Sequence, residues 1–372
     1  MSMRRVILVL ILMSVAPLAQ AAPEESFDLR VPAAPIARAV AGGNELGYEL
    51  HLDNFARRDL QPTQVQVLDA ADGRVLASYQ GAALEQRLDR SGVQWKGATH
   101  QMIASGRRGV VFIELVLGGA PPNTLRHRIH YRGAADDADA TPIEGGTTSV
   151  IAGRTPVLAP PLRGGPWAAV YDARWERGHR RVGYAVGGRL RTPGRYAVDW
   201  VKLDAAGRKA PAGEDLAART YSHGQAVLAV ANGVVSRVRD DLPERARLSD
   251  KAAATEGNSL SLALDDGRYA HYGHLRPGSA KVAAGTRVKA GDVIAEVGFS
   301  GSASDPQLHF ALTDGPDELA SEGIAYTFDR YSLLGGYGDV AQIGADVWTA
   351  AEPGKQAQAL MPAALSVVQW RE

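Results

Sequence analysis

The stretch of sequence that decides the fold covers residues 257–310 and reads "GNSLSLALDDGRYAHYGHLRPGSAKVAAGTRVKAGDVIAEVGFSGSASDPQLHF". It alternates apolar with polar residues over short runs, and turn-forming groups such as "DDG" and "RPGS" separate those runs. This pattern is typical of antiparallel β-strands. The segments "RYAVDW" (195–200) and "QAVLAVANGVV" (225–235) continue it upstream, so we expect a mainly β domain over residues 161–345.

Polar side chains on these expected strands share faces. Residues two apart in a strand point to the same side, so Gln307 and His309 lie together, away from the core-facing Leu308. Asp199 and His274 lie on two further expected strands. If these strands are neighbours in one sheet, Asp199, His274 and His309 converge on one polar spot.

This polar spot has the composition of a metal site. Two histidines and a carboxylate with an open fourth position are typical ligands of catalytic zinc. The loop "WERGHRR" (175–181) supplies a further imidazole, His179. Histidine and aspartate also occur together in strands that bind no metal. In that case His274 is a hydrogen-bonded strand residue and His309 a half-buried one.

The first part of the chain predicts a second β domain. Residues 24–133 alternate over four short segments at the spacing of an immunoglobulin-like β-sandwich, at 45–55, 64–81, 109–118 and 124–133. The histidines of this region are expected to be solvated or packed strand residues rather than ligands; they are His51, His100, His127 and His130.

Four further segments are assigned other roles. Residues 134–160 are rich in small, acidic and turn-forming residues, which predicts a linker between the two domains. Residues 240–257 predict a loop or short helix at the rim of a groove, and residues 321–336 are expected to close one side of it. Residues 346–372 are expected to form a C-terminal tail without a functional signal.

Composition and the leader indicate where the protein works. The chain has 372 residues, 45% of them hydrophobic, and a formal net charge of +0. This balance favours a globular protein and argues against a nucleic-acid-binding surface. The basic start, the apolar run 6–15 and the small residues of "AQA" (19–21) make residues 1–21 a secretory signal peptide.

The remainder of the chain is expected to be periplasmic or secreted. No later segment is long and apolar enough to span a bilayer, so we expect no membrane anchor after signal cleavage. The chain has no cysteine, so an exported form has no disulfides and depends on packing or on a metal for stability.

In their order along the chain, the quoted segments resemble the lysostaphin-type, or LytM-like, zinc endopeptidases. That family carries a His and Asp pair, then a "Y-x-H-L" strand, a glycine-rich turn and "P-H-L-H-F", and residues 195–310 carry nearly all of this series. The resemblance implies a groove-shaped antiparallel β-sheet core with a duplicated hybrid motif. It also implies an enzyme that cuts peptide bonds of peptidoglycan or of other glycine-containing peptides.

The resemblance assigns roles residue by residue. Asp199 and His309 match two ligands of a Zn²⁺ ion. His274 matches the histidine of "Y-x-H-L", which stabilises the transition state or handles protons without binding the metal.

Two positions depart from the family pattern. Arg195 stands where the first metal-binding histidine is expected, and a guanidinium cannot ligate zinc. Another histidine must then complete the site, with His179 as the first candidate and His223 in "YSHGQ" as the alternative. Gln307 replaces a catalytic histidine; its amide can donate a hydrogen bond to an oxyanion but cannot shuttle a proton. Losing such a group typically costs about a hundred- to ten-thousand-fold in rate.

Two functions follow. The first is an exported zinc metalloendopeptidase of peptidoglycan, with His179, Asp199 and His309 on the metal and with His274 and Gln307 as catalytic groups. The second is a catalytically weakened LytM-like domain that binds the cell wall or regulates another cell-wall hydrolase. We favour the enzyme because Asp199 and His309 are both retained. A lipoyl-type carrier is not supported, because no attachment lysine follows the turn of residues 285–298.

Overall fold

The computed structural model describes residues 25–90, 102–133, 136, 138–151, 153, 155–172, 175, 178–253 and 257–371. These residues are mainly β, which confirms the predicted class, and among them the only α-helix is the single turn α1 (Ala82–Glu85). None of the helices in this part of the chain has the length and apolar character needed to cross a membrane. The predicted signal peptide, residues 1–21, and His100 lie outside the described residues.

The N-terminal part consists of two antiparallel sheets around one core. The first sheet contains β1 (Phe27–Arg30), β2 (Ala37–Val40), β3 (Gly43–Asn54), β6 (Leu88–Arg90) and β7 (Arg108–Leu117). The second contains β4 (Leu60–Asp69), β5 (Val75–Gln80), β8 (Thr124–Gly133) and β9 (Ile143–Ser149). Alternate residues of β3 and β8 supply one shared cluster of buried side chains, as a two-layer sandwich requires. The immunoglobulin type of this sandwich stays a prediction.

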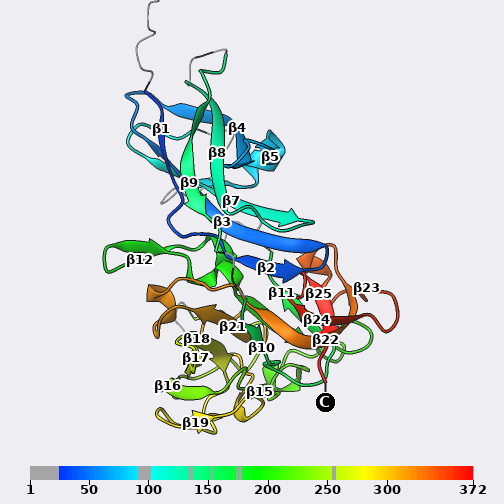
Figure 1. Ribbon diagram of the computed structural model, residues 1–372. Coiled ribbons are helices and arrows are strands. Elements are labelled where there is room, and N and C mark those ends of the chain that lie inside the picture. The colour runs from blue at the N-terminus through cyan, green and yellow to red at the C-terminus, as the bar shows by residue number, and fades with distance from the viewer. Residues whose placement is uncertain are drawn as a thin grey trace, which may run out of the picture.

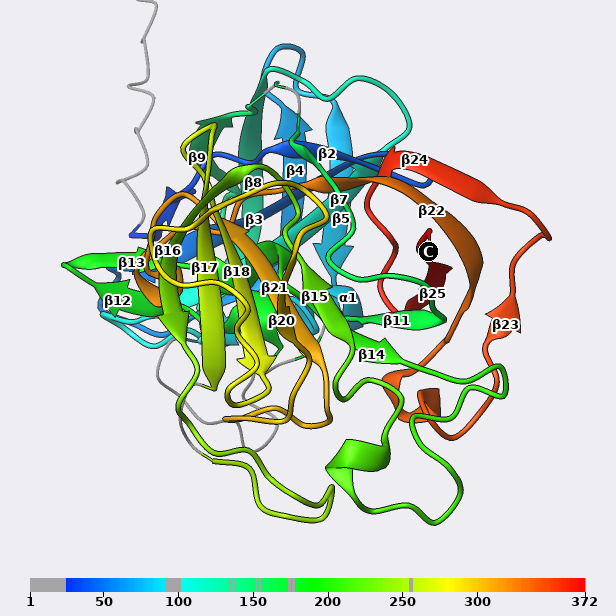
Figure 2. The same ribbon diagram turned by 90° about the horizontal axis from the view of Figure 1, so that it is seen from below.

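A large sheet forms the second part of the molecule. Its strands follow the order β10-β22-β25-β11-β14-β21-β18-β17-β16-β19, with β23 and β24 paired to β22. Their bounds are β10 (Val157–Leu158), β11 (Trp167–Val170), β14 (Val198–Lys202), β16 (Gly233–Arg239), β17 (Asn258–Leu264), β18 (Tyr269–Leu275), β19 (Arg287–Val288), β21 (Leu308–Thr313), β22 (Thr327–Gly336), β23 (Thr349–Ala350), β24 (Gln356–Leu360) and β25 (Ser366–Gln369). Seen from below, β17, β18 and β21 lie side by side (Figure 2).

Two segments placed outside the predicted β domains, the linker and the tail, contribute strands to these sheets. Strand β9 lies within residues 134–160, the predicted linker, and pairs with β8. Strand β25 lies within the predicted tail and pairs with both β11 and β22. Residues 240–253 contain no helix. The domain boundaries drawn from composition therefore exclude residues that complete both sheets.

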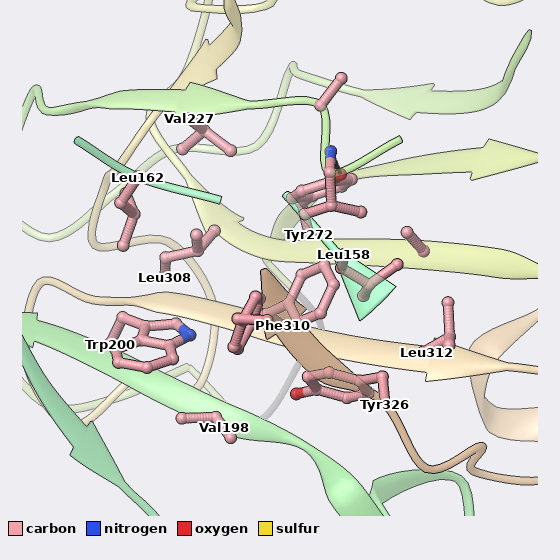
Figure 3. Packing of buried hydrophobic residues seen from close by; sticks show 14 of the residues in the cluster. Leu158, Leu162, Val198, Trp200, Val227, Tyr272, Leu308, Phe310, Leu312 and Tyr326 are labelled. Atoms are coloured by element: carbon pink, nitrogen blue, oxygen red, sulfur yellow. Dashed lines mark hydrogen bonds between the residues drawn. The ribbon is translucent and has the colours of Figure 1, made fainter. Parts of the chain in front are cut away.

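The core of the large sheet fixes the strands that carry the polar spot. Leu308, Phe310 and Leu312 of β21 alternate into the core, together with Trp200 of β14 and Tyr272 of β18 (Figure 3). A two-stranded sheet of β15 (Ala226–Leu228) and β20 (Val293–Glu296) contributes further side chains to the same core. Burying one such aromatic or aliphatic side chain contributes about 1.5–3 kcal/mol. The residues between them, His309 included, are thereby held on the opposite face.

Short turns lie where the two parts meet. They are the 3₁₀ turns η1 (His179–Arg181) and η2 (Pro193–Tyr196), with the hairpin of β12 (Tyr184–Val186) and β13 (Arg189–Arg191) between them. The hairpin projects beside the boundary between β3 and the large sheet (Figure 1). Three further 3₁₀ turns are η3 (Ala217–Arg219), η4 (Glu318–Ala320) and η5 (Val340–Gln342).

Candidate metal centre

Strand register places Asp199 directly opposite His309. The two residues are antiparallel partners between β14 and β21, and His309 Nδ1 lies 2.9 Å from Asp199 Oδ1. On its other side His309 faces Gly273 of β18. A Cβ atom on Gly273 would lie 3.2 Å from the Cβ and 3.4 Å from the Cδ2 of His309. The glycine therefore leaves room for the imidazole ring.

His179 reaches the same carboxylate from outside the sheet. It begins η1, and its Nε2 lies 2.8 Å from Asp199 Oδ2. The rings of His179 and His309 are 4.7 Å apart between centroids. One ligand atom from each of His179, Asp199 and His309 can be chosen such that all lie within 4.8 Å of one another. The structure thus brings together the three residues that the sequence nominated for a metal.

A second carboxylate holds the far nitrogen of His309. Glu318 of η4 places Oε1 2.9 Å from His309 Nε2. Burial by itself lowers the pKa of His309, but Glu318 and Asp199 outweigh it and raise the pKa to about 10. At neutral pH the ring is therefore protonated and donates to both carboxylates.

Asp199 is stabilised as a carboxylate. It is buried, and burial by itself raises the pKa of its carboxyl group. The charge of His179 and the hydrogen bonds from His179 and His309 outweigh burial and hold the pKa well below its usual range. Burial likewise raises the pKa of Glu318, but His309 overrides it and lowers the pKa to about 2. Two anionic groups thus flank one protonated imidazole, an arrangement that favours a cation at this point.

His274 lies beside the group without joining it. Its ring centroid is 5.9 Å from that of His309, and its Nδ1 lies 3.0 Å from the carbonyl oxygen of Ser300. Burial lowers the pKa of His274 to about 4, so the ring is neutral. Since Nδ1–H donates to the carbonyl, Nε2 carries the lone pair. His274 also has a φ of 61°, a left-handed conformation that is costly outside glycine and is found at functional sites.

A cavity of about 470 Å³ opens over these side chains. His179, His274 and His309 line it together with η4, and much of the remaining wall consists of small residues, namely Gly194, Gly257, Ser259, Ser261, Gly273 and Ser302. The loop 316–319 borders the cavity, whereas residues 321–336, expected to close it, lead into β22. A chain segment can therefore approach the three donors closely from one side.

The other nominated residues lie elsewhere. Gln307 is 4% exposed, accepts a 3.5 Å hydrogen bond from Ser304, and is not among the residues that line the cavity. His223 pairs with Glu244 at 2.9 Å instead of reaching Asp199. Arg195 is buried against Glu49 of β3, with its Nε 3.0 Å from Oε1. Of the two histidines considered for the first ligand position, His179 is the one at Asp199.

The donor set fits zinc. Two ligand atoms that each lie about 2 Å from the same ion are at most about 4 Å from one another. The ligand atoms of His179, Asp199 and His309 lie within 4.8 Å of one another, which is close to that separation. Two imidazoles and one carboxylate are also the residue types of catalytic zinc sites. A histidine that binds a metal usually donates its other N–H to a carboxylate. His309 meets that condition, with Nδ1 towards the group and Nε2 on Glu318.

The middle of the chain matches a known family. Residues 210–320 match the model of Peptidase family M23. This segment is an M23 domain. It includes His274, His309 and Glu318, whereas His179 and Asp199 precede it in the sequence. The recognition made from the sequence motifs is thereby confirmed.

Solved structures are similar to part of this chain at low identity. The catalytic domain of the antimicrobial peptidase lysostaphin from Staphylococcus simulans is 18% identical, covering 44% of this chain and 88% of its own, with a TM-score of 0.24. A variant of the catalytic domain of the prophage-encoded M23 protein EnpA from Enterococcus faecalis is 18% identical, covering 46% and 94%, with a TM-score of 0.27. No curated protein matches the chain.

Sequence reasoning missed Glu318. Its carboxylate lies nine residues after His309 in a loop, outside any strand pattern. The available signal was the acidic run "DGPDE" (314–318) that follows the His309 strand. Such a run is usually a solvated turn, so the pattern alone does not place one of its members on an imidazole.

Proposed function

We propose that the protein is an exported zinc metalloendopeptidase that hydrolyses peptide bonds of bacterial peptidoglycan. The observation that carries the proposal is the convergence of His179, Asp199 and His309, two of which, His179 and His309, line an open cavity. The M23 match supports the peptidase reaction. A periplasmic or secreted location follows from the predicted signal peptide in residues 1–21.

The chain's own residues divide the chemical work. A zinc ion bound at this group would supply a polarised water and a positive charge beside the scissile carbonyl. Asp199 and Glu318 keep the ring of His309 in one orientation through its two nitrogens. His274 offers the lone pair of Nε2 to a proton released in the cavity. Gln307 occupies the position of a catalytic imidazole in the family motif, but it does not line the cavity, so the reaction lacks the contribution of that imidazole.

The shape of the cavity supports a peptide substrate with small side chains. Glycine and serine make up much of its wall, so an extended backbone can lie close to the three donors. Bulky substrate side chains next to the cleaved bond would meet the floor formed by β17 and β18. Glycine-containing peptides of the cell wall meet this requirement.

A second candidate function rests on Gln307. Because Gln307 is buried and carries an amide where relatives by motif carry an imidazole, the domain would bind the cell wall or regulate another wall hydrolase with little cleavage of its own. The retained donor group argues against this reading. Both candidates predict wall binding, and they differ in turnover.

Metal content tests the donor group. Elemental analysis of the purified full chain should find one zinc ion per molecule, and His309→Ala should remove it. His223→Ala is the matched control, because His223 pairs with Glu244 away from the group and its loss should leave zinc in place. A wild-type protein without zinc, or zinc retained by His309→Ala, contradicts the proposal.

Turnover separates the two candidate functions. Release of peptides from purified peptidoglycan should be measurable for the wild type and higher for Gln307→His. An inert wild type with an active Gln307→His variant assigns the native protein to wall binding or regulation. Zinc-loaded proteins that both fail to cleave would remove the peptidase assignment.

A further inference from the structure

The segment that carries His179 is docked on the N-terminal sandwich. Along β3, Leu46, Tyr48 and Leu50 alternate into the sandwich core. The residues between them face outwards, towards the large sheet, and β3 lies at the boundary of the two parts (Figure 1). Two of these outward positions, Gly47 and Glu49, contact the turns η1 and η2.

The first contact is a buried ion pair between the two parts. Arg195 of η2 donates Nε to both oxygens of Glu49, at 3.0 and 3.1 Å, and its side chain is 5% exposed against 3% for Glu49. The same guanidinium also pairs with Glu322. Leaving one member of such a pair buried without its partner is strongly destabilising. The pair therefore favours the docked position of η2 strongly.

A second contact holds η1. Arg180, the residue after His179, donates Nη2 to the carbonyl oxygen of Ile113 at 2.7 Å and pairs with Glu114 at 3.1 Å. A Cβ on Gly47 would lie 2.6 Å from Nη1 of Arg180, so a side chain at this position would displace the guanidinium from its present place. The hydroxyl of Tyr196 donates to the carbonyl oxygen of Gly47 at 3.0 Å.

The two turns are in direct backbone contact with one another. A Cβ on Gly194 would lie 2.6 Å from the carbonyl oxygen of His179. Arg180 follows His179 and Arg195 follows Gly194 in the sequence. These two arginines are the residues that the sandwich binds. His179 is also the member of the donor group that no strand of the large sheet carries. Its position therefore depends on how η1 and η2 are held.

We infer that the N-terminal sandwich is a structural part of the metal centre, holding His179 in position through Glu49, Gly47 and the Ile113–Glu114 segment of β7. Arg180 and Arg195 are positioning residues on the receiving side. The inference rests on the proposed function, because it assigns His179 to the metal. It gives the sandwich a role within the site itself, beyond spacing the M23 domain from other molecules.

Full-length variants of the sandwich test this inference. Glu49→Gln removes the charge that binds Arg195, and Gly47→Leu places a side chain where the Arg180 guanidinium lies. Asp53→Asn is the matched control, because Asp53 lies on the same face of β3 but pairs with Arg30 and Arg108 of the sandwich. Zinc affinity of the metal-stripped proteins is measured by competition with a chromogenic chelator. Hydrogen exchange of residues 178–197 is measured without metal.

We expect zinc binding at least about tenfold weaker in Glu49→Gln and Gly47→Leu, the range seen when partners of metal ligands are lost. Both should also show faster exchange in residues 178–197, while Asp53→Asn matches the wild type in both measurements. If Glu49→Gln does not fold, Gly47→Leu decides, since Gly47 contributes no side chain to the sandwich core.

Wild-type affinity and exchange in folded sandwich variants would overturn the inference. A wild type that binds no zinc would instead remove the proposed function, and the exchange rates alone would then decide whether the sandwich holds this segment.

Discussion

Two strand histidines, one in each part of the molecule, have opposite surroundings. His127 of β8 is fully buried, with Nε2 2.8 Å from the hydroxyl of Tyr48 and Nδ1 3.0 Å from the carbonyl oxygen of Gly146. His309 of β21 also uses both nitrogens, but its partners are the carboxylates of Asp199 and Glu318. Burial lowers the pKa of His127 to about 4, whereas the two carboxylates raise the pKa of His309 to about 10.

The partners, rather than burial, separate a structural histidine from a candidate ligand. One donated and one accepted hydrogen bond satisfy both nitrogens of His127 as a neutral ring. Neither partner carries a negative charge that would favour a cation. The two carboxylates at His309 carry more negative charge than one imidazolium neutralises. A proton occupies this position in the metal-free protein, and binding of a divalent cation would release it. Each prediction below changes either the partners of His309 or the protonation of His127.

The largest effect is expected from Asp199→Asn. This substitution keeps the size of the side chain but replaces one of the two carboxylates at His309 with a neutral group, so that the surroundings of His309 approach those of His127. It also removes a charged metal ligand. Zinc affinity, measured by chelator competition, should fall by more than the about 100-fold that follows loss of a ligand's supporting partner.

Asp240→Asn provides the control for that experiment. Asp240 lies in the same M23 segment and accepts backbone N–H groups of Ser279 and Ala280, outside the donor group. Its isosteric amide should leave zinc affinity at the wild-type level. Equal affinities for the two variants would mean that Asp199 is no ligand and that its contact with the histidines is only structural.

The alternation of apolar and polar residues predicted that both histidines lie in strands. Alternation within "TLRHRIHYRG" made His127 a solvated or packed strand residue rather than a ligand, and alternation within "PQLHFAL" placed His309 on a polar face. Both strands exist, as β8 and β21. The order of the motifs in residues 195–310 is by itself sufficient to indicate the M23 family. Period-two patterns report faces directly, since successive strand residues point to opposite sides.

Contacts between distant segments were beyond such patterns. Glu318 reaches His309 from a loop, and Glu49 meets Arg195 across 146 positions of sequence. Arg195 was excluded as a ligand by its chemistry, but its role against the sandwich depends on how two domains dock. Strand periodicity can be read from neighbouring residues of the sequence. The same neighbours carry no information on how two domains dock.

A smaller effect is expected from acid. Because the pKa of His127 is lowered from about 6.5 to about 4 on folding, the folded state binds fewer protons than the unfolded state between these values. The stability contributed by neutral His127 is complete above pH about 6.5 and is lost as the pH falls towards 4. The expected loss of unfolding free energy is about 2 kcal/mol at pH 5 and roughly 3 kcal/mol below pH 4.

Thermal unfolding at pH 7 and pH 5 measures this loss. His127→Gln lowers stability at both pH values, because it disturbs the bonds to Tyr48 and Gly146, but it has no imidazole to protonate. Its change in unfolding temperature between the two pH values should therefore be smaller than that of the wild type. An identical pH dependence in the two proteins would show that His127 is not the acid-sensitive group.

The smallest effect is expected from Glu318→Gln, which removes the second carboxylate at His309 but no ligand. The amide oxygen can still accept from Nε2–H, so the ring keeps its orientation, while the negative charge that favours a cation is lost. Zinc affinity should fall by about 10–100-fold. Asp317→Asn removes the same charge from the same cavity wall without touching His309, and it should have little effect. Equal losses in the two variants would assign the effect to the charge of the cavity as a whole. A loss confined to Glu318→Gln would assign it to the negative charge in direct contact with His309, the feature that distinguishes the surroundings of this histidine from those of His127.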